Sequence, residues 1–219
     1  MEKRVLLCDF TGVYEKEGLC GSGTAIGFSD LAGTDMYIDG EAEKEILKRL
    51  SKAGFPGGYA LRFLDNGNHH YMTRLLASFA DEPFDMITLD NHTDDQPPAF
   101  EGLKSCGSWR LDIRKENRYL ERSMLIRKPE DMGTEYEVSE RPLYISLDKD
   151  ILSTDVLETN WDQGEMSRKE LFEVLDMFFE TRRIMAFDVC GEDAPERPWD
   201  RNRRFNLELI ERYTGTGCS

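Results

Sequence analysis

Short, mainly apolar runs alternate with segments of helical periodicity along this 219-residue chain, and this alternation constrains its fold more than any other feature. Each run is bounded by polar residues or glycine, which is typical of a buried strand. The runs cover residues 5–8, 60–64, 86–89, 143–147 and 184–189. We expect each of them to be a strand of one sheet.

Four further segments carry apolar residues at helical spacing. In residues 41–53, Ile46, Leu47 and Leu50 fall on one helical face. The other segments are 71–80, 167–182 and 200–213, and the second of these opens with Ser-x-x-Glu, a capping-box pattern. Strands separated by helices of this length predict an α/β fold, a three-layer α-β-α arrangement with a mostly parallel sheet.

The segment 97–141 is less regular. Short apolar stretches at 103–106 and 123–126 indicate strands, but their order in the sheet does not follow from the sequence. The chain shows neither a repeat nor a low-complexity stretch, and its length suffices for one core of ordinary size. We therefore expect residues 1–219 to form a single domain.

Composition excludes several classes of partner. A formal net charge of -15 argues against nucleic acid, because phosphate backbones are bound by Lys and Arg. No apolar run approaches the roughly 18 residues that span a bilayer, and the apolar run at the N-terminus is too short for a signal peptide. The five cysteines are scattered, which fits a reducing compartment. We expect a cytoplasmic protein without membrane contact.

Polar clusters follow four of the predicted strands. They lie at residues 65–70, 90–94, 148–150 and 188–193. In parallel sheets, ligand sites form at the carboxyl ends of the strands. We therefore expect these clusters to meet in one crevice.

Two of the clusters have carboxylates at alternate positions. Residues i, i+2 and i+4 of an extended segment point the same way, so Asp90, His92 and Asp94 are expected to converge, as are Asp148 and Asp150. With His70 this makes four carboxylates and two imidazoles. Four adjacent carboxylates need counter-charge to remain ionised, and two divalent cations supply it.

The types of ligand indicate the metal. A site rich in oxygen, with one imidazole for each ion, suits Mn²⁺ better than structural Zn²⁺. Two such ions can share a water and lower its pKa, which gives a hydroxide nucleophile near neutral pH. The residues thus predict a hydrolase with two Mn²⁺ per chain.

The same motifs resemble those of the arginase/agmatinase (ureohydrolase) family. The resemblance covers Gly67-Asn68-His69-His70, Asp90-Asn91-His92-Thr93-Asp94 and Ser146-Leu147-Asp148-Lys149-Asp150, where the family has Gly-Gly-Asp-His, Asp-Ala-His-x-Asp and Ser-x-Asp-x-Asp. It implies an arginase/deacetylase-like fold. It also implies that one ion is bound by His70, Asp90, Asp94 and Asp148, and the other by Asp90, His92, Asp148 and Asp150, with Asp90 and Asp148 bridging.

The resemblance also implies catalytic roles. Asp94 would orient the hydroxide, which hydrolyses a guanidino group to urea and an amine. Glu192 would pair with the substrate guanidinium, with Asp193 as the alternative because the spacing from Asp188 is one residue longer than in the family. Arginine, agmatine or an arginine-containing peptide are the expected substrates. Family members are often oligomers, so a homo-oligomer is possible.

Several residues depart from the family pattern. Cys106 stands where the family has a proton-shuttling histidine, and residues 160–164, Asn-Trp-Asp-Gln-Gly, stand near its usual Pro-Gly-Gly. Short arginase-like proteins, including those that hydrolyse peptidyl arginine, look similar in these respects. Two alternatives stay open: a deacetylase-like metal amidohydrolase, which the His69-His70 pair suggests, and a metal-binding protein without turnover. We expect His69 to pack against its neighbours rather than bind metal.

Overall fold

Seven strands form one sheet in the order β2-β1-β4-β9-β8-β5-β7, and each neighbouring pair is parallel. The structure is a computed structural model that describes residues 4–98, 100, 102–132, 139–193 and 200–215. The strands are β1 (Arg4–Asp9), β2 (Thr24–Gly27), β4 (Tyr59–Phe63), β5 (Phe84–Leu89), β7 (Leu120–Ile126), β8 (Leu143–Asp148) and β9 (Ile184–Cys190). The predicted parallel sheet is confirmed.

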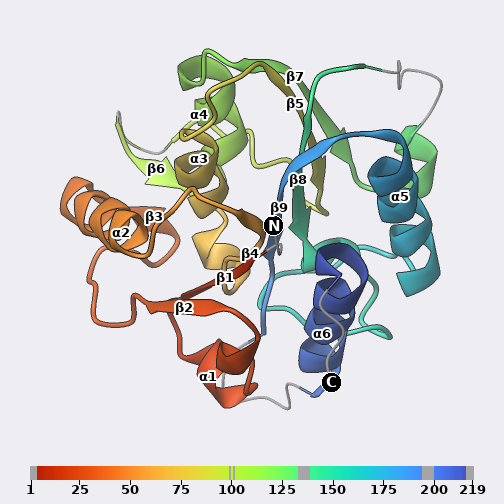
Figure 1. Cartoon of the computed structure of the whole chain (residues 1–219), viewed down its shortest axis with the longest axis horizontal. Helices are drawn as coiled ribbons and strands as arrows, with labels where there is room; N and C mark the ends of the chain where they lie inside the picture. The colour runs from red at the N-terminus through yellow and green to blue at the C-terminus, as the bar shows by residue number, and fades with distance from the viewer. Residues whose placement is uncertain (1–3, 99, 101, 133–138, 194–199, 216–219) are drawn as a thin grey trace.

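Helices cover both faces of this sheet, as the sequence predicted (Figure 1). On one face lie α2 (Gly40–Lys52), α3 (Met72–Ala77) and α4 (Trp109–Glu116), and on the other α5 (Arg168–Thr181) and α6 (Asp200–Thr214). The remaining described helical elements are short: α1 (Val13–Lys16), η1 (Cys20–Ser22), η2 (Gly67–His69), η3 (Pro129–Met132) and η4 (Lys149–Ile151). The result is a three-layer α-β-α fold with one hydrophobic core on each side of the sheet.

Local signals fix the starts of the main helices. The Asp39 side chain accepts hydrogen bonds from the backbone N–H groups of Glu41 and Ala42, so it caps α2. Ser167 and Glu170 form the predicted capping box at the start of α5. In both helices the apolar stripe faces the sheet, so the residues that give the helix its periodicity also pack into the core.

The alternation of side chains along β8 explains how a buried strand also carries polar groups. Leu143, Ile145 and Leu147 enter the core beneath α5 and α6. Tyr144 enters the opposite core, so Ser146 and Asp148, which follow at alternate positions, lie on the α2–α4 side. Polar side chains therefore share one face of the sheet, toward the carboxyl ends of its central strands.

Some elements differ from the sequence expectation. The stretch at 123–126 is part of β7, an edge strand of the main sheet, whereas the stretch at 103–106 forms β6 (Lys104–Ser105) and pairs antiparallel with β3 (Tyr37–Ile38) outside that sheet. The helix expected over 71–80 is shorter. Neither β2 nor α4 was predicted. The edge strand β2 is only four residues long and α4 is rich in charge, so each carries a weak apolar signal.

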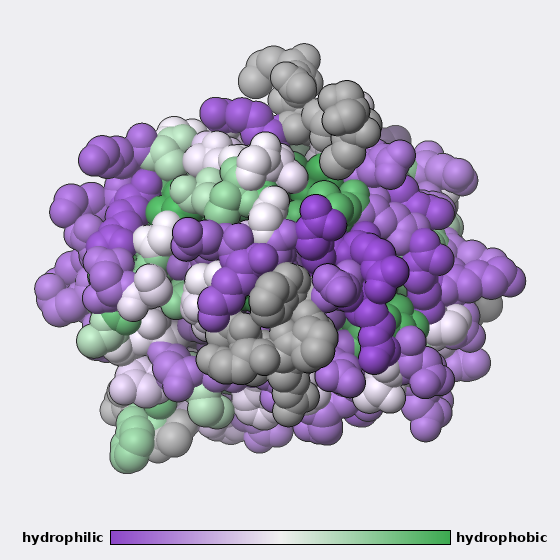
Figure 2. Space-filling model, turned by 90° about the horizontal axis from the view of Figure 1, so that it is seen from below, coloured by the Kyte–Doolittle hydropathy of each residue, from purple (hydrophilic) through white to green (hydrophobic). Residues whose placement is uncertain are grey.

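The surface is strongly polar. Figure 2 shows one face on which hydrophilic residues predominate over scattered hydrophobic ones, in keeping with a chain of which 32% is charged. Among the described residues, no helix is both long and apolar enough to cross a membrane.

Candidate metal centre

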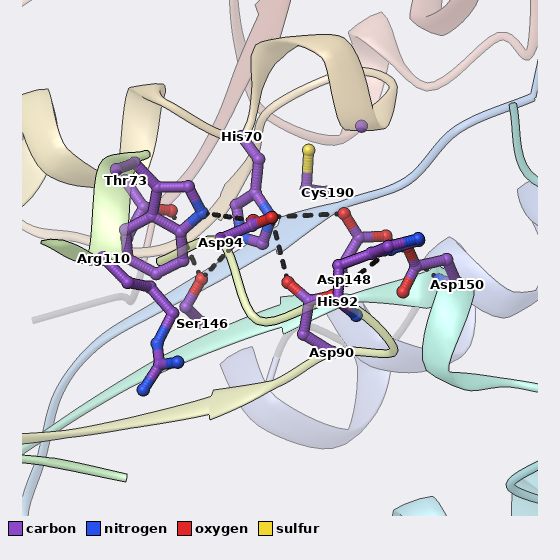
Figure 3. Close-up of polar contacts among 12 residues, drawn as sticks. His70, Thr73, Asp90, His92, Asp94, Arg110, Ser146, Asp148, Asp150 and Cys190 are labelled. Carbon is purple, nitrogen blue, oxygen red and sulfur yellow. Dashed lines mark hydrogen bonds and ion pairs between the residues drawn. The ribbon is translucent and has the colours of Figure 1, made fainter. Parts of the chain in front are cut away.

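Three of the four polar clusters meet where the central strands β4, β8 and β5 end. β4, β9, β8 and β5 are consecutive neighbours in the sheet, and the segments that follow β4, β8 and β5 bring His70, Asp148 and Asp90 together. Figure 3 shows these side chains pointing toward one another from separate elements. The expectation of a single crevice at the carboxyl ends of the strands agrees with this geometry.

A first group of atoms surrounds the Nδ1 atom of His70. Carboxylate oxygens of Asp90, Asp94 and Asp148 lie 3.4, 3.3 and 3.2 Å from this nitrogen. Donor atoms this close together can bind the same cation, because metal–nitrogen and metal–oxygen bonds in such sites are about 2.0–2.2 Å long.

A second group surrounds the Nδ1 atom of His92. It lies 2.7 Å from Asp150 Oδ2 and 3.8 Å from Asp90 Oδ1. Asp90 thus belongs to both groups, while the contacts of Asp148 place it with His70. All six predicted ligands are therefore close together, in two overlapping sets.

The backbone brings them there differently from the extended segments we expected. Asp94 has a left-handed conformation, with φ of 47°, so residues 90–94 form a loop rather than the continuation of β5. After β8 the chain turns into η4, and the Asp148 side chain accepts a hydrogen bond from the Asp150 N–H at 3.0 Å. Strand alternation places Asp148, the last residue of β8, whereas loop and turn geometry places Asp94 and Asp150.

Burial makes this cluster electrostatically costly without cations. Asp90, Asp148 and Asp150 are 1, 3 and 2% exposed. Burial, together with the charges of the neighbouring aspartates, raises the pKa of Asp90 well above its ordinary value, and burial and the Asp148 charge raise the pKa of Asp150 to about 6. Burial alone would also raise the pKa of Asp148, but its hydrogen bond to His70 holds it below the ordinary range.

The pKa values of the two imidazoles are raised as well. Burial opposes charge on His70, yet hydrogen bonds to Asp148 and Asp94 raise its pKa to about 10, and the hydrogen bond to Asp150 raises the pKa of His92 to about 9. Two imidazolium charges would balance only two of the four negative charges of the ionised carboxylates. The Oδ2 atom of Asp90 is buried and has no hydrogen-bond partner among the described residues. A cluster of this kind fits divalent cations, which would complete the charge balance and bind the unpaired oxygen.

Other side chains orient the cluster, and the sequence did not single them out for this role. Ser146 Oγ lies 2.9 Å from His70 Nε2, and Trp109 Nε1 donates to Asp94 Oδ2 at 2.6 Å. Cys190 pairs in register with Asp148 on the next strand and lies near both His70 and Asp148. For Ser146, the sequence offered one signal, its place two residues before Asp148 in the Asp-x-Asp motif. Trp109 and Cys190 had none, because their places depend on tertiary packing.

A cavity of 260 Å³ opens over the cluster. Besides Asp90, His92, Asp94, Asp148 and Asp150, it is lined by Gly67, Thr93, Gln96, Cys106, Gly107 and Trp161. Burial and the nearby Asp94 charge raise the pKa of Cys106 to about 12, so it is a thiol at neutral pH. His69 instead stacks on Phe10 with ring centroids 4.1 Å apart, as expected for a packing residue.

Glu192 lies elsewhere. Its carboxylate is fully buried, pairs with Lys149 Nζ at 2.6 Å and accepts hydrogen bonds from Asn202 and Asn206. Neither Glu192 nor Asp193 is among the residues that line the cavity. A contact of Glu192 with the substrate stays a prediction, and in this structure its carboxylate pairs with Lys149 outside the residues that line the cavity.

Comparison with known proteins supports the fold. No family model matches the chain. An uncharacterized protein of Thermotoga maritima is 27% identical over 222 residues, which cover 93% of this chain and 87% of that protein. Among solved structures, proclavaminate amidino hydrolase of Streptomyces clavuligerus matches with a TM-score of 0.67 and 16% identity, over 97% of this chain and 92% of the other.

Formiminoglutamase of Trypanosoma cruzi, solved with Mn²⁺, matches with a TM-score of 0.64 and 12% identity, over 94% of this chain and 91% of the other. The matched structures also include agmatinases and arginases. At these identities the likeness is one of fold. The chain therefore has the arginase-like α/β fold that these ureohydrolases share.

Proposed function

We propose that this chain is a metal-dependent hydrolase of the ureohydrolase type, which cleaves a C–N bond of a guanidino or amidino group. One observation carries the proposal: four carboxylates and two imidazoles converge beneath a cavity, and a buried oxygen of Asp90 has no hydrogen-bond partner among the described residues. The arginase-like fold supports it, because matched structures include amidino hydrolases, agmatinases and arginases.

Two Mn²⁺ ions are the proposed cofactor. His70, Asp90, Asp94 and Asp148 would hold one, and Asp90, His92 and Asp150 the other, with Asp148 at the border of the two groups. Bound cations of this kind lower the pKa of water and polarise the carbon that is attacked. The matched T. cruzi enzyme contains Mn²⁺, which supports the choice of metal.

Side chains that line the cavity would accept a proton and bind the substrate. Asp94 lines the cavity and is fixed through Oδ2 by Trp109, so its carboxylate is placed to accept a proton from the attacking water. Addition of water to the guanidinium carbon and loss of the substituted nitrogen would give urea and an amine. Trp161, Gln96 and Thr93 line the cavity and would contact the rest of the substrate.

Product analysis tests this proposal. The purified chain, loaded with Mn²⁺, is incubated with arginine, agmatine and arginine-containing peptides, and urea is measured. Urea release that a chelator abolishes and Mn²⁺ restores is the expected result. Tight metal binding without any product would identify a metal-binding protein that lacks turnover. Acetate release from acetylated amines with one Zn²⁺ per chain would identify a deacetylase-like enzyme instead.

A further inference from the structure

His92 is held on both sides of its ring. Its Nδ1 atom faces Asp150 and Asp90, whereas its Nε2 atom lies 3.2 Å from Oδ1 of Asp162. The ring of Trp161 meets the imidazole edge-on, at a centroid distance of 5.6 Å and an angle of 69°. Both contacts beyond the ligand cluster come from residues 159–164, here called the bracing loop.

We propose that Asp162 is a positioning residue for the metal centre: it accepts a hydrogen bond from Nε2–H of His92 and so leaves Nδ1 as the metal-binding nitrogen. This inference rests on the proposed function. A histidine that binds metal through one nitrogen usually donates its other N–H to a carboxylate or carbonyl, which fixes the tautomer and makes the ligand more basic. Nδ1 is the nitrogen that faces Asp90 and Asp150, so Nε2 is the one that must donate.

The bracing loop is tied to the segments that carry the ligands. The N–H of Gly164 donates to the carbonyl of Asp150 at 2.7 Å, and the carbonyl of Asp162 accepts from Asn91 Nδ2 at 3.0 Å. Asn91 lies between Asp90 and His92, so both contacts connect the loop directly to a ligand segment. The Asp162 side chain is 84% exposed, but its backbone is thereby held in place beside His92.

The other end of the loop packs on the segment that leads to His70. Gly67 donates its N–H to Asn160 Oδ1 at 3.0 Å, and Trp161 Nε1 donates to Asn68 Oδ1 at 2.9 Å. A Cβ atom at Gly67 would lie 2.5 Å from the Trp161 ring, so only glycine permits this approach. The loop therefore connects the segments of both histidine ligands, and Asp162 is its contact with the imidazole.

The opposing view is that an exposed hydrogen bond to His92 has no consequence, since exposed ion pairs contribute little to stability. Metal affinity separates the two views. We compare Asp162→Ala, Asp162→Asn and the matched control Asp155→Ala, an exposed aspartate of the same connection between β8 and α5. Mn²⁺ affinity is measured by calorimetric titration, and His92→Asn identifies the ion bound on the His92 side.

The expected result is selective. Asp162→Ala weakens the ion on the His92 side by roughly 10- to 100-fold and leaves the ion at His70 unchanged. Asp162→Asn, whose amide oxygen can still accept the hydrogen bond, recovers part of the loss. Asp155→Ala binds both ions like the wild type. Equal affinities in wild type and Asp162→Ala would overturn the positioning role.

Nitrogen-15 NMR of the Zn²⁺-loaded chain gives a readout that does not depend on activity. With three histidines in the sequence, the His92 signals can be assigned by the His92→Asn variant. We expect a protonated Nε2 in the wild type, with faster exchange of that proton in Asp162→Ala. Binding of two ions without hydrolysis of any guanidino or amidino compound would refute the proposed function alone. A wild-type chain that binds no ion at His92 would overturn both proposals.

Discussion

At the scale of single residues, Asp90 is the side chain on which the centre depends most. Its two oxygens face the two histidine groups: Oδ2 lies near His70, and Oδ1 lies near the His92 ring and accepts a hydrogen bond from the backbone N–H of His92 at 2.6 Å. A carboxylate between two positively charged positions is favourable, whereas the same carboxylate buried among other carboxylates is not. Asp90 should therefore affect metal binding far more than it affects folding.

We predict that Asp90→Asn abolishes both the retention of two Mn²⁺ ions and urea release. The neutral amide removes one charge and one oxygen ligand from the position shared by both groups. Metal content after gel filtration and product release measure the two losses, with Asp155→Asn as the control that keeps both. Retention of two ions by Asp90→Asn would contradict the position of Asp90 between them.

Ser146 gives a second prediction at this scale. Its hydroxyl lies 2.9 Å from Nε2 of His70 and 3.3 Å from the hydroxyl of Thr73. Ser146→Ala leaves the buried Nε2 without this partner, so we expect roughly 10- to 100-fold weaker binding of the ion at His70. Calorimetric titration with Mn²⁺ measures this affinity.

Ser167→Ala is the matched control for Ser146→Ala. It removes the cap of α5 and costs about 1 kcal/mol of stability, but it lies outside the metal centre. If both serine variants bind Mn²⁺ as tightly as the wild type, Ser146 does not orient His70.

At the scale of elements, the sequence predicted the strands of the central sheet other than β2, as apolar runs, and the helices α2, α3, α5 and α6, from their helical periodicity. The structure contains the predicted capping box at Ser167 and the predicted apolar stripe of α2, in which Ile46 and Leu50 are buried. The order of the strands, the edge strand β2 and the pairing of β3 with β6 depend on tertiary contacts, which leave no local period.

The same distinction holds for the candidate site. The six candidate ligands were predictable because all of them follow predicted strands that end at one edge of the sheet, and five of them stand at alternate positions. They are His70, Asp90, His92, Asp94, Asp148 and Asp150. The role of Asp162 was not, because its contact with His92 spans 70 residues and depends on the path of the bracing loop. The ion pair of Glu192 with Lys149 was not predictable either, because it too depends on how the segments after β8 and β9 pack.

The contact between β4 and β9 gives a prediction at this scale. Arg62 and Asp188 pair across these strands at 2.5 Å, both are buried, and the Tyr144 hydroxyl donates to Asp188 at 2.6 Å. We predict that Arg62→Leu lowers the free energy of unfolding by about 3–5 kcal/mol, because it leaves a buried carboxylate without its cation. Urea denaturation measures the loss.

The double variant Arg62→Leu/Asp188→Leu is the control for this prediction. Removing both partners leaves no unpaired buried charge, so much of the lost stability should return. A single variant that loses less than about 1 kcal/mol would show that the pair does not bear on the stability of the sheet.

At the scale of the whole molecule, the buried cluster makes stability depend on pH and on metal together. Hydrogen bonds to aspartates raise the pKa of His70 to about 10 and that of His92 to about 9, from an ordinary value near 6.5. The folded metal-free chain therefore binds protons that the unfolded chain releases above that pH. Their contribution to stability is complete below pH 6.5 and is lost as the pH rises toward 9 and 10.

We predict that the metal-free chain unfolds at a lower temperature at pH 9 than at pH 6.5, and that Mn²⁺ reduces this difference. Metal binds the neutral imidazole, so the ions replace the protons and bind more tightly as the pH rises. Thermal unfolding with chelator or with Mn²⁺, at both pH values, measures the effect. Glu17 contributes with the same sign, because burial and the charge of Glu192 raise its pKa to about 9.

The variant His70→Gln/His92→Gln separates the two sources of this pH dependence. It removes both imidazoles of the centre and leaves the buried carboxyl groups, so the slope that remains between pH 6.5 and 9 reports groups such as Glu17 and Asp90, whose pKa values burial raises. A slope equal to that of the wild type would show that the imidazoles of the folded chain do not bind protons in this range. The charge balance inferred for the metal-free cluster would then be wrong, because its four carboxylates would lack their two imidazolium partners.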